Sequence, residues 1–312
     1  MTITGPATRT APSRAPGASG RGAGCSALSA DAGEPMAGSA PAFRRLVAVE
    51  HVGSWPRKVA DHSDTDVAAL FERLRGQDVG LLLIRRTGRA GRSSDGARTV
   101  FVADLAPGAS RVVRTEVHST DDLAGIDADD TVFDSPAAEP VTDPVMLLCA
   151  HGRRDVCCAV HGRALAAELE AADADVWECT HLGGHRFAPT GLVLPTGYTY
   201  GRLDTAAALS AMKAAAGGEV DPWCCRGHAG LEPAQQVAEL AVREATGIRD
   251  AGALLVDAVD GPGAVTVHAR EHDRRWSVDV RADTGVAARP PSCGAALEPV
   301  TPLVAAGVRE IG

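Results

Sequence analysis

Four residues of the types that bind metals lie within one short stretch of the chain. Cys149 and Cys158 are separated by eight residues, and His181 and His185 follow, with Leu182-Gly183-Gly184 between them. Thiolates are soft donors and imidazoles are borderline donors. The set therefore suits either zinc or a two-iron, two-sulfur (2Fe-2S) cluster in which histidines replace two cysteines on one iron. The sequence predicts a metal centre and leaves these two alternatives open.

Predicted strands would bring the two pairs of ligands together. The apolar run 145–149 predicts a strand that ends at Cys149, and residues 175–180 predict a second strand that ends just before His181. A helix is expected between them, over 156–171. Both pairs should therefore lie at the same end of adjacent strands, with Gly183-Gly184 forming a tight loop.

Two further cysteines are possible ligands. Cys157 competes with Cys158 for one position, because neighbouring side chains point in different directions and only one of them needs to reach the metal. Cys179 lies two residues before His181 and is a reserve ligand, the alternative being a small buried apolar residue.

Composition limits the class of protein. The 312 residues carry a net charge of -9, which argues against nonspecific nucleic-acid binding, because neutralising phosphates requires an excess of Lys and Arg. No run approaches the roughly 20 apolar residues that a membrane helix requires, and the N-terminus lacks the apolar core of a secretion signal. We therefore expect a cytoplasmic protein that binds neither membranes nor nucleic acids. The eight cysteines are clustered rather than spread as a disulfide scaffold, so we expect all of them to be reduced.

The chain divides into four predicted regions of a mixed α/β (α+β) protein. Residues 1–42 are rich in Gly, Ala, Ser and Pro and predict a disordered tail, within which Met36 is a second possible start. Residues 43–135 predict an N-terminal α/β domain. Residues 143–217 have the predicted order β, α, β, β, β, α, which is compatible with a thioredoxin-like unit. Residues 218–312 predict a C-terminal extension of one helix and a strand meander.

The other elements are predicted from periodicity. Strands are expected over 46–49, 79–84, 99–103, 111–117, 192–194, 198–200, 254–258, 265–270 and 276–281, and helices over 64–75, 204–216 and 233–245. Residues 121–143 are expected to be an acidic linker, and 284–312 have no assignable pattern. The basic loop 85–97 is either a docking site for an acidic redox partner or a solvated surface loop.

Two segments resemble the sucrase/ferredoxin-like family, and they read CAHGRRDVCC at 149–158 and WECTHLGGHRFA at 177–188. The resemblance extends over roughly 44–245, through Glu50-His51, Gly53 and Trp55. It implies a thioredoxin-like ferredoxin domain with a 2Fe-2S cluster. The implied ligands are Cys149 and Cys158 on one iron and His181 and His185 on the other, which favours Cys158 over Cys157.

The leading hypothesis is an electron carrier or redox sensor that exchanges electrons with a partner protein such as a reductase, with proton uptake coupled to electron uptake. The alternative is a structural zinc-binding domain of an interaction protein. A thiol oxidoreductase is a third hypothesis, which the absence of a Cys-x-x-Cys pair disfavours. Whether the protein is an enzyme stays open. Sucrose hydrolysis is not supported, since no pair of carboxylates is set out for it.

Overall fold

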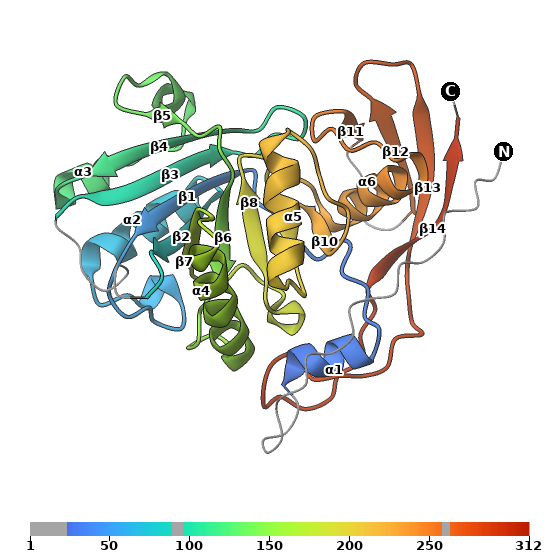
Figure 1. The fold of residues 1–312 in the computed structure, drawn as a ribbon, viewed down its shortest axis with the longest axis horizontal. Helices are drawn as coiled ribbons and strands as arrows, with labels where there is room; N and C mark the ends of the chain where they lie inside the picture. The colour runs from blue at the N-terminus through green and yellow to red at the C-terminus, as the bar shows by residue number, and fades with distance from the viewer. Residues whose placement is uncertain (1–23, 89–95, 258–262, 312) are drawn as a thin grey trace.

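The computed structural model describes residues 24–88, 96–257 and 263–311. Its main element is a ten-stranded sheet with the order β10-β9-β8-β6-β7-β2-β1-β3-β4-β5 (Figure 1). The strands are β1 (Arg45–Glu50), β2 (Val79–Arg85), β3 (Arg98–Asp104), β4 (Arg111–Val117), β5 (Glu139–Pro140), β6 (Val145–Cys149), β7 (Val176–Cys179), β8 (Gly191–Leu194), β9 (Tyr198–Tyr200) and β10 (Cys225–His228). The predicted mixed α/β fold is confirmed.

The N-terminal part of the sheet is built around α2 (Thr65–Gly76). This helix begins at Asp64, whose carboxylate accepts the backbone N–H groups of Asp66 and Val67. Its buried face, which includes Val67 and Leu70, packs on alternate residues of β1 and β2. β1 and β2 are parallel, as a strand, helix, strand unit requires.

The second part has the strand arrangement of the expected thioredoxin-like unit. β6 pairs in parallel with β7 and antiparallel with β8, and β8 continues into the hairpin with β9. The helices α4 (Arg163–Ala171) and α5 (Thr205–Ala216) pack on one face of these strands. The predicted helix over 156–171 is present, but it opens with a π turn, η4 (Cys158–Gly162).

The two parts share one sheet and one core. β2 pairs antiparallel with β7, where Ile84 lies opposite Cys179. The Arg85 guanidinium binds the Glu178 carboxylate at 2.7 Å across this junction. Apolar side chains from both parts form a common buried cluster, which includes Cys149 and Cys158. The predicted ligands therefore lie where the two halves of the chain meet.

Two predictions about irregular segments were wrong, and a third segment had no prediction. Residues 24–42, expected to belong to a disordered tail, contain the helix α1 (Cys25–Asp31) and are held by polar contacts that apolar periodicity does not reveal; residues 1–23 lie outside the described part. The expected linker over 121–143 contains α3 (Thr120–Gly125), a 3₁₀ turn and β5. The unassigned residues 284–312 contain β14 (Leu303–Glu310).

The C-terminal region combines a helix with a separate four-stranded meander. α6 (Pro233–Thr246) packs on β11 (Leu254–Val256), β12 (Gly263–Ala269), β13 (Arg275–Ala282) and β14, around Trp276. The chain after β13 then passes beside α1, so that segments from both ends of the sequence lie side by side near the ends of β6 and β7 (Figure 1). No helix among the described residues has the length and apolar character needed to cross a membrane.

Candidate metal centre

Two thiols and an imidazole gather where β6 and β7 end. Cys149 is the last residue of β6, Cys158 is the first residue of η4, and His181 follows β7 by two residues. One donor atom from each of these residues lies within 4.8 Å of the other two. Both cysteines are fully buried. Three of the four predicted ligands therefore share one small volume.

His185 lies against His181 but does not come within 4.8 Å of all three other donors. Its Nδ1 is 3.4 Å from Nε2 of His181. Nδ1 of His181 is in turn 3.8 Å from Sγ of Cys149. The four donors thus run from the two sulfurs through the His181 ring to His185.

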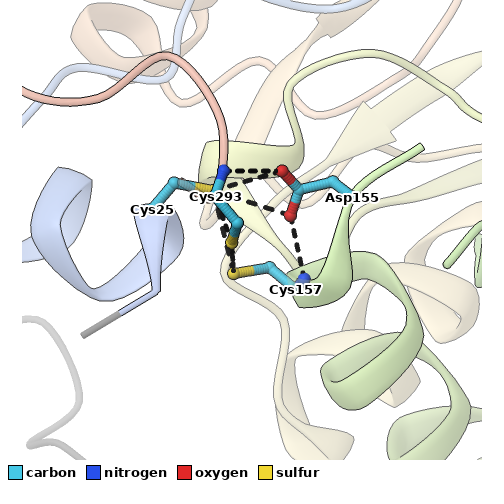
Figure 2. Close-up of side chains that lie close together, drawn as sticks. All are labelled: Cys25, Asp155, Cys157 and Cys293. Atoms are coloured by element: carbon cyan, nitrogen blue, oxygen red, sulfur yellow. Dashed lines mark hydrogen bonds between the residues drawn. The ribbon is translucent and has the colours of Figure 1, made fainter. Parts of the chain in front are cut away.

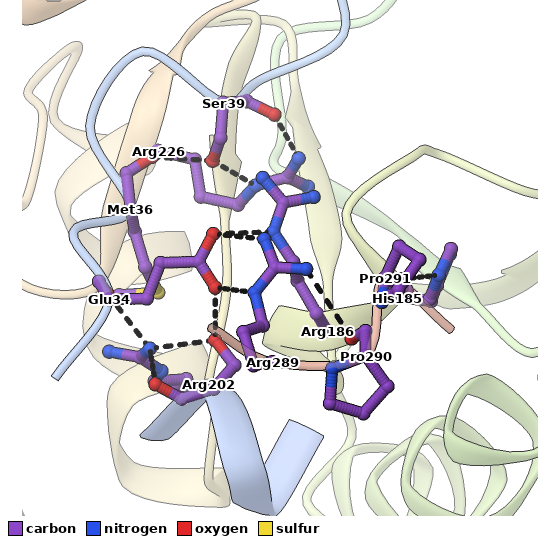
Figure 3. A network of polar contacts seen from close by, with 11 residues as sticks. Glu34, Met36, Ser39, His185, Arg186, Arg202, Arg226, Arg289, Pro290 and Pro291 are labelled. Carbon is purple, nitrogen blue, oxygen red and sulfur yellow. Dashed lines mark hydrogen bonds and ion pairs between the residues drawn. The ribbon is translucent and has the colours of Figure 1, made fainter. Parts of the chain in front are cut away.

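The second ring nitrogen of His185 is held by the C-terminal segment. Nε2 donates a hydrogen bond to the carbonyl oxygen of Pro291 at 2.5 Å (Figure 3). Oδ2 of Asp155 lies 3.8 Å from the same nitrogen. A ligating histidine commonly donates its other N–H in this way, which fixes the tautomer and the ring orientation. Nδ1 of His185 is left free to bind a metal beside Nε2 of His181.

Local electrostatics give one cysteine and one histidine the protonation states that metal ligands need, whereas the hydrogen bond to Cys149 and burial raise the pKa of Cys158. The hydrogen bond from Cys158 lowers the pKa of Cys149 well below its ordinary value, although burial opposes it, and His181 adds to the lowering. Burial lowers the pKa of His185 below 6.5, although the Pro291 carbonyl and Asp155 oppose it. A thiolate and a neutral imidazole, the forms that bind metals, are therefore available near neutral pH.

A buried guanidinium supports the histidine loop. Arg226, in β10, donates hydrogen bonds to the hydroxyl of Ser39 at 3.1 Å and to the Ser39 carbonyl (Figure 3). It also donates to the carbonyl oxygen of Gly183 at 3.3 Å. Gly184 has a φ of +65°, and a Cβ there would collide with this guanidinium, so both its conformation and its neighbour require glycine. Burial lowers the pKa of Arg226 to about 9.

Glu34 ties three segments together around the histidine loop. Its carboxylate accepts hydrogen bonds from Arg186 at 2.7 Å and from Nε and Nη2 of Arg289 at 2.5 Å each (Figure 3), and from the Ser29 hydroxyl at 2.8 Å. Burial opposes ionisation, but the hydrogen bonds from Arg289 and Arg186 outweigh it and lower the pKa of Glu34. We call this group of Glu34, Arg186 and Arg289 the clasp. It holds the chain that carries Pro291 next to His185.

The two other predicted candidates have different surroundings. Cys179 is fully buried among apolar side chains, burial raises its pKa, and it joins neither group of donors found in the described residues. Its environment is that of a small apolar residue. Cys157 points away from Cys149 and toward Cys25 and Cys293. Cys158 is thus the member of the pair that lies beside Cys149.

A pocket of about 610 Å³ opens next to His181. Its lining includes the cationic residues Arg57, Lys58 and Arg154, and an ion pair between Arg75 and Glu72. His151 also lines the pocket, and its Nε2 donates to the Pro56 carbonyl at 2.7 Å. This pocket gives the His181 side of the site an electropositive approach from outside.

Sequence reasoning missed the residues that surround the ligands. Arg226, Glu34 and Pro291 are far from the ligands in sequence and belong to segments without apolar periodicity. The only local signal was Asp155, which lies inside the Cys149–Cys158 loop and reaches His185.

Comparison with protein families finds a match between residues 36–222 and the family described as sucrase/ferredoxin-like. These residues include all four predicted ligands and the strands from β1 to β9. Cys25, Cys293, β10 and the four-stranded sheet lie outside the match. No curated protein and no solved structure matched the chain.

Proposed function

We propose that this chain, which belongs to the sucrase/ferredoxin-like family, carries a 2Fe-2S cluster on Cys149, Cys158, His181 and His185 and works as an electron carrier or redox sensor. When bound, such a cluster accepts and releases one electron at a time. The donor set fits it, with two thiols at one end and two imidazoles at the other.

The position of His185 outside the group formed by the other three donors carries the proposal. Four donors on one tetrahedral zinc ion lie within ~4 Å of one another, given Zn–S and Zn–N bonds of about 2.3 and 2.0 Å. His181 and His185 satisfy this between themselves at 3.4 Å. His185, however, lies outside the 4.8 Å group formed by Cys149, Cys158 and His181. Three donors in one group, with a fourth beyond the His181 ring, suit a site longer than a single metal ion, such as a two-iron cluster.

The residues around the ligands set the conditions for electron uptake. Arg226 is a buried cation, and no carboxylate among the described residues is within hydrogen-bonding distance of it. Its positive charge favours an added negative charge at the site and therefore raises the reduction potential. The Pro291 carbonyl and the Asp155 carboxylate both lie at the N–H group of His185. A proton lost or gained at that nitrogen therefore changes how His185 interacts with the segment that carries Pro291.

The electropositive pocket beside His181 supports contact with an acidic redox partner. Arg57, Lys58 and Arg154 would attract an acidic surface and bring it to His181, which lines that pocket. The partner would be a reductase that supplies electrons, since the sequence has no nucleotide-binding motif of its own.

The proposal is tested by purifying the full chain without oxygen and measuring visible absorption, the EPR spectrum after dithionite, and iron, sulfide and zinc on one sample. A coloured protein with about two irons and two sulfides and a Rieske-like reduced signal is expected. Cys158→Ser should abolish the signal, and Cys224→Ser, a half-buried cysteine elsewhere, should not. A colourless protein that holds zinc at Cys149 and Cys158 would instead identify a structural zinc domain.

A further inference from the structure

Three thiols from distant parts of the chain meet on the outer side of the Cys149–Cys158 loop. Cys25 begins α1, Cys157 precedes η4, and Cys293 belongs to the segment after β13 (Figure 2). The Sγ atoms of Cys25 and Cys157 are 3.7 Å apart, those of Cys25 and Cys293 3.6 Å, and those of Cys157 and Cys293 3.1 Å. Cys25 and Cys157 are buried, and Cys293 is partly buried.

A buried carboxylate completes the group. The two oxygens of Asp155 lie 3.7 and 3.8 Å from Sγ of Cys25. Oδ1 accepts the backbone N–H of Cys157 at 2.8 Å, and Oδ2 accepts that of Cys293 at 2.9 Å (Figure 2). Each oxygen of a carboxylate has two lone pairs, so one on each oxygen remains for a metal. The hydroxyl of Ser26 donates to Sγ of Cys157 at 3.3 Å and orients that sulfur.

We propose that Cys25, Cys157 and Cys293 bind one zinc ion as thiolates and that Asp155 supplies its fourth ligand. Thiolates on one tetrahedral zinc ion lie about 3.8 Å apart, since each Zn–S bond is about 2.3 Å. Two of the three sulfur separations agree with this, and the third is shorter. Soft thiolates select zinc or copper(I), and a carboxylate ligand favours zinc of these two. Four protein ligands leave no open position, as in structural zinc sites.

The arrangement of the thiols argues against a disulfide. A sulfur–sulfur bond is about 2.05 Å long, and a bond between any two of these residues would leave the third thiol unused. Sγ of Cys25 lies 3.7 and 3.6 Å from the other two sulfurs, so all three thiols are close enough to share one ion. Gly24 allows this approach, because a Cβ at its position would lie 2.8 Å from Sγ of Cys157.

The zinc would fasten both terminal segments to the loop that carries Cys158. Asp155 faces Cys25 with its carboxylate and also lies 3.8 Å from Nε2 of His185. Pro291, which accepts the N–H of His185, is two residues from Cys293. The two donor sets share no residue, so zinc binding here does not depend on the proposed 2Fe-2S cluster.

The test measures zinc and iron in the full chain, in Cys25→Ser and Cys293→Ser, and in the controls Cys158→Ser and Cys224→Ser. The wild type and both controls should hold about one zinc per chain, and the two terminal variants less than about a fifth of that. The iron content should fall in Cys158→Ser. Thermal unfolding of Cys25→Ser and Cys293→Ser should still give a cooperative melting transition. A wild-type chain that holds zinc but no iron would count against the proposed function and leave the zinc site standing.

A measurement on the unmodified protein keeps the test independent of how well the variants fold. Removing the zinc with a chelator should expose three additional thiols to a thiol-reactive dye. Zinc that remains in both terminal variants, or a zinc-free native chain whose mass is lower by two hydrogens, would overturn the proposal.

Discussion

Replacing Glu34 with alanine should destabilise the protein strongly, because it leaves the clasp with two cations and no anion. The side chain of Glu34 is 1% exposed, that of Arg289 6% and that of Arg186 27%. Removing one partner of a buried ion pair costs about 3–5 kcal/mol. Arg186 can turn partly toward water, whereas Arg289 cannot. We therefore expect the lower end of this range, about 3 kcal/mol.

Urea unfolding followed by tryptophan fluorescence measures this loss as a lower midpoint at an unchanged slope. Glu219→Ala is the matched control, because its carboxylate binds Arg249 at 3.1 Å with both side chains about half exposed, and such pairs contribute roughly 0.5 kcal/mol or less. The freed terminal segments should also be cut sooner by a protease. If Glu34→Ala loses no more stability than Glu219→Ala, the clasp does not hold the ends of the chain and the reasoning is wrong.

Four further predictions concern the site and the core. His185→Cys should retain a cluster but lower its reduction potential, because a thiolate adds negative charge; an unchanged potential in redox titration would remove His185 as a ligand. Arg226→Gln should lower the potential by roughly 50 mV, since losing a nearby buried charge changes the interaction by on the order of 1 kcal/mol; the same titration measures it. Arg154→Glu should slow reaction with an anionic oxidant and reverse the salt dependence of the rate, whereas equal salt dependence would argue against the electropositive approach. Burial lowers the pKa of His228 from 6.5 to about 4. Below pH 6.5 the unfolded chain therefore binds a proton that the folded chain does not, and the free energy of unfolding decreases as the pH is lowered. Urea unfolding should show a loss of about 2 kcal/mol between pH 7 and pH 5 that is absent in His228→Gln, and equal slopes would contradict the assignment.

Regular elements were predictable where a local pattern decides them. α2 has apolar residues at helical spacing and an acidic capping residue at Asp64, and β6 is a continuous apolar run. β10 was missed because Cys-Arg-Gly-His has no alternating apolar pattern, and its arginine is buried only through partners that lie far away in sequence. Likewise α1 is held by Cys25 and Glu34, whose partners lie up to 268 residues away. No local rule predicts such contacts.

In the candidate site, too, some residues were predictable from local sequence and others were not. Cys149 and His181 were identified from spacing, because the strands β6 and β7 and their following loops place them at one end of the sheet, whereas the choice of Cys158 over Cys157 came from the family resemblance. Pro291, Arg226 and the clasp were not predictable, since they come from segments whose placement depends on the finished fold.

The pairing of β2 with β7 bears on how this protein can be dissected. A fragment that starts near residue 143 and ends near 217 would keep the four predicted ligands but lose β2 on one side and β10 on the other. Both β7 and β9 would become edge strands, each offering unpaired N–H and C=O groups and buried apolar side chains to other molecules. Such a fragment should self-associate. Studies of the metal centre in isolation therefore call for the intact chain, in which neighbouring segments cover both edges.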